Sequence, residues 1–262
     1  MNYENIIFEV KDGIAYITMN RPNSANAVNL EISRELMLAA IRCDEDPVIR
    51  AVVLTGAGKT FCVGGDLKFF TGCGDQISSV LKEITVYCNA AVSRFSRMQK
   101  PLITSVNGPA AGIGMSFALC GDMIIAAETA SFVAAYTAAA LSPDGGMTYI
   151  LPRMIGLLKA KEIILTNRRL TAHEALNWGM INKLVPGAEL MKETESLAKS
   201  FAKGPTRSLG MVKKLLNDCF SGTLETQMEQ EARGVAEMAR TKDGQEGMGA
   251  FVEKRRPVFI GL

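Results

Sequence analysis

The sequence contains a single histidine, and this scarcity disfavours several kinds of catalysis. His173 lies in Thr171-Ala172-His173-Glu174, a pattern in which the threonine and the glutamate cap the start of a helix. We therefore expect His173 at a surface helix position and not in a catalytic centre. Hydrolases of the Ser-His-Asp and Cys-His types need a histidine beside the nucleophile, so both mechanisms are disfavoured.

The cysteines lack the spacing of a metal site or of a disulfide framework. There are six of them, and none forms a C-x-x-C pair with another. They are scattered through apolar or loop segments, which is typical of reduced thiols that pack as small apolar side chains. We therefore expect no metal ion and no disulfide-bonded scaffold.

A strong net charge and a long apolar run are both absent. The 29 basic and 27 acidic side chains leave a net charge of +2, too small to indicate nucleic acid or a membrane surface as the main partner. No window holds the roughly 18 uncharged apolar residues of a membrane span. The N-terminus, with Glu4 and Glu9, also lacks the basic and apolar regions of a signal peptide. The expectation is a soluble, cytoplasmic protein.

What the sequence does contain is an alternation of short apolar strands and amphipathic helices, which is an α/β pattern. Bursts of apolar residues at 6–10 and 14–19, on either side of Asp12-Gly13, predict a β-hairpin. The chain of 262 residues, 48% hydrophobic, is long enough for a substantial core. Further strands are expected at 50–55, 102–106 and 123–126, and helices at 30–46, 77–98 and 113–120.

Strand signals disappear after about Pro186, where the sequence becomes helical. We predict a core at residues 1–186 that carries the site and a helical layer at 187–262 that packs on the core or on a neighbouring subunit. The expected helices are 189–203, 206–220, 224–240 and 244–255, interrupted at Gly204-Pro205, Gly222 and Gly244.

Two glycine-rich turns are the most informative motifs. The first is Phe61-Cys62-Val63-Gly64-Gly65-Asp66-Leu67, and the second is Gly112-Ile113-Gly114 at the start of a predicted helix. Turns of this kind can direct two backbone N–H groups at one developing negative charge, and a helix N-terminus adds its dipole there. Each turn taken alone is also compatible with an ordinary chain reversal.

Two nucleotide-binding interpretations fit the glycines less well. The segment Gly56–Thr60 follows a strand like the phosphate loop of a nucleoside triphosphatase, but Val53 occupies the position of the first glycine and no helix follows directly. The segment Gly112–Gly114 invites a dinucleotide interpretation, but Phe117 occupies the position of the third glycine. A triphosphatase and a dinucleotide-dependent oxidoreductase are therefore both disfavoured.

The chain carries four ordered blocks, which are Phe61–Leu67, Lys100–Gly114, Leu151–Gly156 and Gly247–Arg255. Together these blocks make the chain resemble the crotonase (enoyl-CoA hydratase/isomerase) superfamily, and the resemblance extends from Arg21-Pro22 to the C-terminus. The motifs are most similar to the 3,2-enoyl-CoA and ring-1,2-epoxyphenylacetyl-CoA isomerase type. The resemblance implies a spiral of ββα units, a helical C-terminal trimerisation layer, and an acyl-CoA substrate. It also implies a homotrimer or a dimer of trimers, and no cofactor, since coenzyme A enters as part of the substrate.

The resemblance also implies roles for individual residues. The backbone N–H groups of Val63 and Ile113 would hold the thioester oxygen as it becomes enolate-like. Ile113 departs from the small residue usual in the family, which leaves the shape of the acyl pocket open. The two glutamates that hydratases of the family use correspond to Ser116 and Tyr136, so water addition by two carboxylates is disfavoured.

Asp144, in Ser142-Pro143-Asp144-Gly145-Gly146, matches the acid/base carboxylate of several isomerases of the family. The alternative interpretation is an N-cap for a helix that begins near Gly145. We expect an isomerase that shifts the double bond of an enoyl-CoA. The alternatives are an enoyl-CoA hydratase with an atypical base and a non-catalytic acyl-CoA binding protein. A dehalogenase with Asp144 as nucleophile and Tyr136 in place of a tryptophan is disfavoured, because His173 lies in the wrong segment.

Contacts to coenzyme A are likewise implied by the resemblance. Phe251 and Lys254 would approach the nucleotide, often from a neighbouring subunit, although Lys254 could equally be a solvated helix end. Asp66 could instead cap a short helix, and residues 69–80 would form the variable wall of the site. The expected substrate-binding residues are Gly64, Gly65, Asp66, Leu67, Gly112, Ser116, Tyr136, Phe251 and Lys254.

Overall fold

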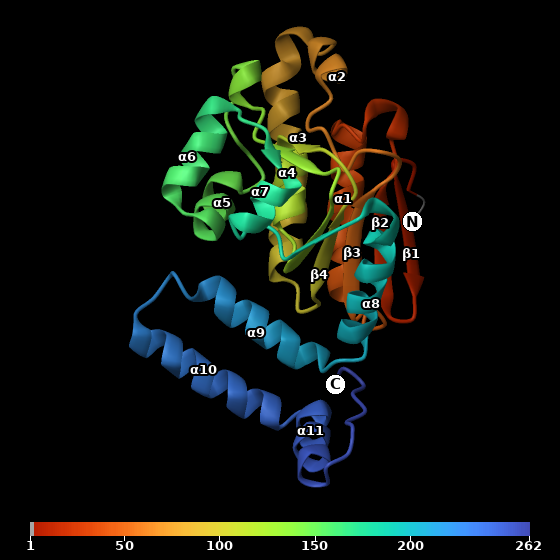
Figure 1. Cartoon of the computed structure of the whole chain (residues 1–262), viewed down its shortest axis with the longest axis vertical. Coiled ribbons are helices and arrows are strands. Elements are labelled where there is room, and N and C mark those ends of the chain that lie inside the picture. The colour runs from red at the N-terminus through yellow and green to blue at the C-terminus, as the bar shows by residue number, and fades with distance from the viewer. Residues whose placement is uncertain (1–2) are drawn as a thin grey trace.

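The structure of this protein, a computed structural model, describes residues 3–262, and a six-stranded sheet forms its centre (Figure 1). The strands are ordered β1-β2-β3-β4-β6-β9, and all neighbours are parallel except β1 and β2, which form the predicted hairpin. A second sheet has the order β5-β7-β8. The strands are β1 (Ile6–Lys11), β2 (Ile14–Met19), β3 (Ala51–Gly56), β4 (Leu102–Val106), β5 (Ala110–Ala111), β6 (Met123–Ala127), β7 (Ser131–Val133), β8 (Leu170–Thr171) and β9 (Lys183–Val185).

The predicted α/β class is confirmed, because helices follow most of the strands and cover both faces of the large sheet. The helices are α1 (Leu30–Glu45), α2 (Leu67–Thr71), α3 (Ile77–Arg97), α4 (Ile113–Leu119), α5 (Met147–Ile155), α6 (Leu157–Thr166), α7 (Ala172–Asn177), α8 (Leu190–Ala202), α9 (Thr206–Asp218), α10 (Leu224–Ala239) and α11 (Lys242–Val252). None of these helices, within residues 3–262, is long and apolar enough to cross a membrane.

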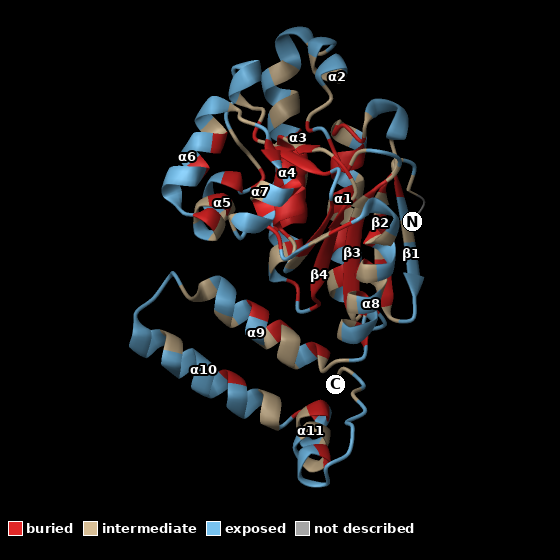
Figure 2. Cartoon of the chain, viewed as in Figure 1, coloured by how far each residue is buried: buried red, intermediate tan, exposed pale blue. Residues whose placement is uncertain are grey.

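Helix α1 illustrates why the sequence folds as predicted. Asn29 caps it, since its side-chain oxygen accepts a hydrogen bond from the N–H of Ile32. Ile32, Leu36 and Cys43 recur at helical spacing and are fully buried. Helix α1 packs against α3. The buried residues of both helices form one core cluster with those of the inner strands, which are red in Figure 2. The largest buried side chains include Phe61, Phe95, Phe117 and Phe132.

The opposite face of the large sheet is covered by α8. Leu190, Ala198 and Ala202 of this helix pack with Val53 and Ile103 of the central strands. Helix α8 therefore packs on the core sheet, although it follows the predicted boundary between residues 186 and 187. The division into 1–186 and 187–262 stays a prediction.

Helices α9, α10 and α11 extend away from the sheet and are mostly exposed (Figures 1 and 2). Arg50, at the entry to β3, ties them to the core, because its guanidinium donates to Thr206 Oγ1 at 3.0 Å and to the Phe259 carbonyl at 3.2 Å. On α9, the buried Lys213 pairs with Asp122 at 2.7 Å. The helical layer is thus anchored to the core by partly buried polar contacts.

One predicted interruption of this layer is wrong. Gly244 lies inside the first turn of α11, where its N–H donates to the Thr241 side chain at 2.9 Å. A Cβ at this position would lie 2.1 Å from the carbonyl oxygen of Met238, so glycine is required by close packing and not by a chain break. The interruptions at Gly204-Pro205 and Gly222 are confirmed.

The scarce residues of the sequence lie where expected. Thr171 and Glu174 form a complete capping box at the start of α7, and His173 is exposed on that helix. All six cysteines are free thiols, and the prediction that most are packed is confirmed for the four that are buried. These are Cys43, Cys62, Cys88 and Cys120.

Candidate active site

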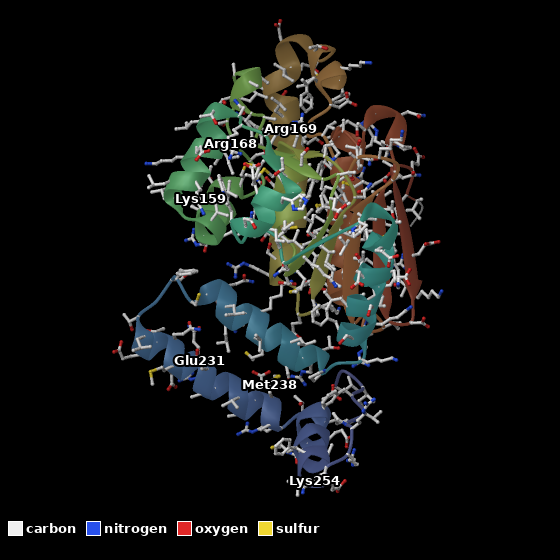
Figure 3. All side chains as sticks on the ribbon, viewed as in Figure 1. Lys159, Arg168, Arg169, Glu231, Met238 and Lys254 are labelled. Carbon is white, nitrogen blue, oxygen red and sulfur yellow. The ribbon has the colours of Figure 1, made fainter. Side chains whose placement is uncertain are left out.

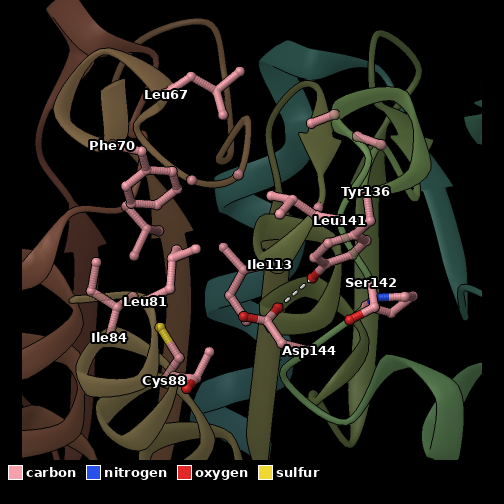
Figure 4. A pocket seen from close by; sticks show the side chains of 18 of the residues that line it. Leu67, Phe70, Leu81, Ile84, Cys88, Ile113, Tyr136, Leu141, Ser142 and Asp144 are labelled. Carbon is pink, nitrogen blue, oxygen red and sulfur yellow. Dashed lines mark hydrogen bonds between the residues drawn. The ribbon is translucent and has the colours of Figure 1, made fainter. Parts of the chain in front are cut away.

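A cavity of about 390 Å³ lies where the two glycine-rich turns meet α3 and the loop that precedes α5 (Figure 4). Most of the residues predicted for the site line this cavity, although they come from three distant parts of the chain. A ligand in this cavity could therefore contact all of them. The predicted residues that line it are Val63, Gly64, Gly65, Leu67, Gly112, Ile113, Tyr136 and Asp144.

Four of the predicted substrate-binding residues do not line the cavity within this chain, and one of them, Ser116, contacts the turn of Asp144 described below. The carboxylate of Asp66 accepts from the N–H of Phe69 at 3.2 Å and pairs with Arg21 at 3.0 Å, so it caps α2 as the alternative interpretation had it. Phe251 lies in the last turn of α11, which Figure 1 places at the opposite end of the molecule from α2 and α3. Lys254 follows just after this helix (Figure 3). Their approach to coenzyme A from a neighbouring subunit stays a prediction.

Backbone packing holds the two turns side by side. The N–H of Ala111 donates to the carbonyl of Cys62 at 2.9 Å. Gly64 adopts a φ of +101°, and a Cβ there would lie 3.0 Å from the carbonyl oxygen of Ala111. A Cβ at Gly114 would lie only 2.2 Å from the carbonyl oxygen of Cys62. Glycines at both positions thus let the first turn lie directly against the start of α4.

The two predicted N–H donors differ in their present partners. Ile113 is the first residue of α4, and its N–H has no acceptor within residues 3–262. The N–H of Val63 donates to the carbonyl of Ala25 at 3.2 Å, which is a long hydrogen bond. A ligand oxygen in the cavity could accept directly from the N–H of Ile113. To accept from the N–H of Val63, it would have to share or replace the hydrogen bond to Ala25.

Asp144 presents its carboxylate to the cavity and is bonded there by a tyrosine. Tyr136 Oη donates to Asp144 Oδ1 at 2.5 Å (Figure 4). Burial raises the pKa of Asp144 above its ordinary value, and the hydrogen bond from Tyr136 opposes that rise. Burial, together with the neighbouring Asp144, also raises the pKa of Tyr136. The tyrosine therefore remains a protonated donor at neutral pH.

The interpretation of Asp144 as a helix cap is wrong. Helix α5 begins at Met147, and Gly146 occupies the N-cap without any side-chain hydrogen bond. The main chain of Asp144 does contribute, because its carbonyl accepts from the Met147 N–H at 3.2 Å. The side chain of Asp144 does not cap the helix and lines the cavity instead.

The turn that carries Asp144 is fixed from two helices. Ser116 of α4 donates its hydroxyl to the Asp144 carbonyl at 3.1 Å, and Asn89 of α3 accepts from the Gly145 N–H at 3.1 Å. A Cβ at Gly145 would lie 2.3 Å from the Cδ1 atom of Ile113. Ser116, predicted to bind substrate, therefore positions the main chain of Asp144 in this structure, and Asn89 has a role that the sequence did not indicate.

The sequence also missed the apolar wall opposite Asp144. Leu81, Ile84 and Cys88 of α3 line the cavity together with Phe70 of α2 (Figure 4). Burial raises the pKa of the Cys88 thiol well above its ordinary value, so this side chain is neutral and the wall carries no charge there. The spacing of Leu81, Ile84 and Cys88 along one helix face is the signal that could have identified it. The predicted wall at 69–80 contributes Phe70 and Ser78.

The cavity brings together a half-buried carboxylate, backbone N–H donors and an apolar wall. Such donors can hold a carbonyl oxygen as negative charge builds on it. A carboxylate of raised pKa can then exchange a proton with the adjacent carbon. The geometry is suited to proton transfer at a carbon next to an activated carbonyl group.

Comparison with known proteins agrees with this chemistry. The sequence profile of the enoyl-CoA hydratase/isomerase family matches residues 9–261. The 1,2-epoxyphenylacetyl-CoA isomerase of Escherichia coli (strain K12) is 37% identical over 98% of this chain and 99% of its own length. A 4-chlorobenzoyl coenzyme A dehalogenase from an Arthrobacter species is 33% identical over 88% of this chain and 84% of its own.

Solved structures share the fold as well. The crystal structure of an enoyl-CoA hydratase from Bacillus anthracis superposes with a TM-score of 0.93 at 31% identity, covering 99% of this chain and 100% of that one. The similarity therefore extends through the helical layer at the C-terminus.

Proposed function

The chain belongs to the enoyl-CoA hydratase/isomerase family, and we propose that it is an isomerase that moves the double bond of an enoyl-CoA thioester, with Asp144 as the acid/base. The observation that carries this proposal is the composition of the cavity. Of the described residues that line it, Asp144 alone bears a carboxylate, and it faces an apolar wall. A single carboxylate suffices to shuttle one proton between two carbons of the same substrate.

The proposed reaction begins when the thioester oxygen accepts hydrogen bonds from the N–H groups of Ile113 and Val63. Asp144 removes a proton from C2 of a 3-enoyl-CoA, and the C–H electrons form an enolate whose charge rests on that oxygen. As the thioester carbonyl reforms, the C1=C2 electron pair of the enolate becomes the C2=C3 double bond, and the electron pair of the former C3=C4 double bond takes the proton of the Asp144 carboxylic acid at C4. Proton and electrons balance within the substrate, so the reaction as proposed uses no metal ion or redox cofactor.

We further propose that coenzyme A binds along Gly64, Gly65 and Leu67 and that the catalytic unit is a homotrimer or a dimer of trimers. Exposed apolar side chains on the helical layer support the assembly, among them Phe251, which is 86% exposed. Sedimentation of the native chain and of Phe251→Asp tests it. A native chain that sediments as a monomer would contradict this part of the proposal.

A dehalogenase has less support in the structure. Hydrolysis of an ester formed on Asp144 would use a histidine to activate water, and His173 is exposed on α7 and does not line the cavity. An isomerase makes no such demand.

The test of the proposed function is an ultraviolet assay for the conjugated thioester, with 3-enoyl-CoA and 2-enoyl-CoA offered separately. Asp144→Asn is expected to lower the formation of conjugated product from 3-enoyl-CoA by about 10²- to 10⁴-fold, the usual contribution of a general acid/base. Asp12→Asn, in the exposed turn between β1 and β2, is the matched control and should behave as the native enzyme.

Two outcomes would overturn the proposal. Loss of conjugation from 2-enoyl-CoA that is unchanged in Asp144→Asn would indicate a hydratase with another base. Tight binding of acyl-CoA without any Asp144-dependent product would indicate a non-catalytic binding protein.

A further inference from the structure

We propose that Tyr136 is a positioning residue that fixes one oxygen of the Asp144 carboxylate, so that the other oxygen alone carries the proton between C2 and C4. The inference rests on the proposed function of Asp144 as acid/base. Its starting observation is the hydrogen bond of 2.5 Å from Tyr136 Oη to Asp144 Oδ1. A distance this short is typical of a hydroxyl that donates to an ionised carboxylate.

No other side chain holds the carboxylate. Among the side chains of residues 3–262, only Tyr136 donates to the Asp144 carboxylate, at Oδ1, and the backbone N–H of Asp144 itself also favours the ionised form. The remaining contacts of Asp144 reach its main chain, through Ser116 and Met147. The Tyr136 hydroxyl is therefore the only side-chain group that orients the carboxylate among the described residues, whereas Ser116 and Met147 hold the backbone of the turn.

Backbone conformation and hydrogen bonds restrain the loop that carries Tyr136. Ala135 and Ala140, on either side of it, both adopt left-handed backbone conformations, with φ values of 63° and 55°. Non-glycine residues adopt this region at a cost and do so where surrounding contacts determine the backbone. Here the carbonyl of Tyr136 accepts from the N–H groups of Ala139 and Leu141, each at 3.0 Å. The loop is also held from outside, because Asn167 at the end of α6 donates to the side chain of Thr137.

Few ionisable groups compete with this contact. From α3, Cys88 and the exposed Lys82 line the same cavity, and the buried Cys62 lies in the first turn. Burial raises the pKa values of both cysteines, that of Cys62 to about 12, so neither carries charge at neutral pH. Helix α4 has no ionisable side chain.

Helix α5, which follows the Asp144 turn, carries Tyr149 and Arg153, which stack on each other at the surface with 3.4 Å between the guanidinium carbon and the ring centroid. Tyr136 is thus the ionisable neighbour in hydrogen-bond contact with Asp144. It stays neutral itself, because its own pKa is raised.

Tyr136→Phe is the variant that tests the inference, because it keeps the ring and removes only the hydroxyl. The proton transfer needs ionised Asp144, so kcat/KM rises as the pH rises through the pKa of this group. Loss of a hydrogen bond to the ionised form favours the protonated form and raises that pKa. We expect the ascending limb of the kcat/KM profile with 3-enoyl-CoA to move upward by about one to two pH units.

A merely structural role would lower the plateau of the profile without moving its limb. Tyr149→Phe is the matched control, since Tyr149 lies on the surface of α5 outside the cavity, and its profile should equal that of the native enzyme. An unmoved limb in a Tyr136→Phe protein with native circular dichroism and thermal melting would overturn the inference.

A second readout separates this inference from the proposed function. The chain labelled with ¹³C at aspartate Cγ is titrated by NMR, and the Asp144 resonance is assigned by its loss in Asp144→Asn. The titration midpoint should be higher in Tyr136→Phe than in the native chain. If the native chain does not isomerise enoyl-CoA but the midpoint moves, the proposed function fails and the contact is upheld. If the midpoint does not move, the inference fails whatever reaction is found.

Discussion

Gly114 at the start of α4 lies against the carbonyl oxygen of Cys62, and a Cβ at position 114 would come within 2.2 Å of that oxygen. The contact sets the spacing between the N–H groups of Val63 and Ile113. We expect Gly114→Ala to push α4 away from the first turn and to lower the free energy of unfolding by about 1–3 kcal/mol, as overpacking usually does. Activity with 3-enoyl-CoA should fall in kcat more than it changes in KM, because the donors act mainly on the developing charge.

The measurement for Gly114→Ala is urea denaturation together with steady-state kinetics. Gly249→Ala is the matched control, because Gly249 lies within α11 and a Cβ there would meet no atom within 4 Å. That variant should be neutral or more stable by up to about 1 kcal/mol, the helix preference of alanine over glycine. Equal stability of the two variants would contradict the packing argument.

Asp144→Asn should stabilise the fold while it abolishes the proposed activity. Because burial raises the pKa of Asp144 in the folded state, the folded protein binds protons more tightly than the unfolded chain. Ionisation of Asp144 therefore costs stability as the pH rises through the interval between the two pKa values. At pH 7 the asparagine variant should be more stable by about 0.5–2 kcal/mol, which is typical of substitutions that remove strain at a functional site.

This stability gain should disappear at a pH below the ordinary pKa of aspartate, roughly 4, where Asp144 is protonated in both states. Thermal denaturation of the native and variant chains across this pH range measures the difference. A gain that is independent of pH would mean that ionisation of Asp144 is not its cause.

Isomerisation should transfer a substrate hydrogen within the molecule. With Oδ1 held by Tyr136, the proton taken from C2 resides on the free oxygen Oδ2 at the apolar face of the cavity. A 3-enoyl-CoA labelled with deuterium at C2 should give product with deuterium at C4, as measured by NMR or mass spectrometry. Unlabelled substrate in deuterated water should acquire little label there. Complete exchange with solvent in both experiments would contradict a single shuttling oxygen.

The ion pair between the buried Lys213 and the more accessible Asp122 should anchor the helical layer. Lys213 Nζ lies 2.7 Å from Asp122 Oδ2 and also donates to the Phe95 carbonyl at 2.7 Å. Lys213→Met would leave Asp122 without its counter-ion and should lower the free energy of unfolding by about 1–2 kcal/mol, because Asp122 is partly accessible to solvent. Lys214→Met, at the exposed neighbouring position on the same helix, should change it by less than about 0.5 kcal/mol. Chemical denaturation distinguishes the two, and equal effects would show that the ion pair is not the anchor.

Local features of the fold were predictable because they depend on residues adjacent in sequence. The spacing of Ile32, Leu36 and Cys43 predicted α1, and Thr171 with Glu174 predicted the cap of α7. The failure at Gly244 has a tertiary cause, since its Cβ position is occupied by the chain before the helix. The sequence alone does not distinguish a glycine required by close packing from a glycine that ends a helix.

The candidate site was predictable only in part, for the same reason. The turns and Asp144 carry motifs, and the structure brings them to one cavity. The contact between Tyr136 and Asp144 depends on left-handed conformations at Ala135 and Ala140, and alanine gives no signal for such a backbone. Tyr136 could be assigned to the site, but its partner could not be assigned from the sequence.

The N–H of Val63 donates to the carbonyl of Ala25, so this carbonyl would compete with the oxygen of the proposed thioester substrate for the same donor. A neutral thioester that displaces Ala25 exchanges one carbonyl acceptor for another and gains little. An enolate oxygen carries more negative charge than the Ala25 carbonyl, so it gains much more from the same exchange. Competition from the Ala25 carbonyl therefore weakens binding of the neutral thioester more than it weakens binding of the charged enolate. The Val63 N–H thus selects acceptors by their negative charge.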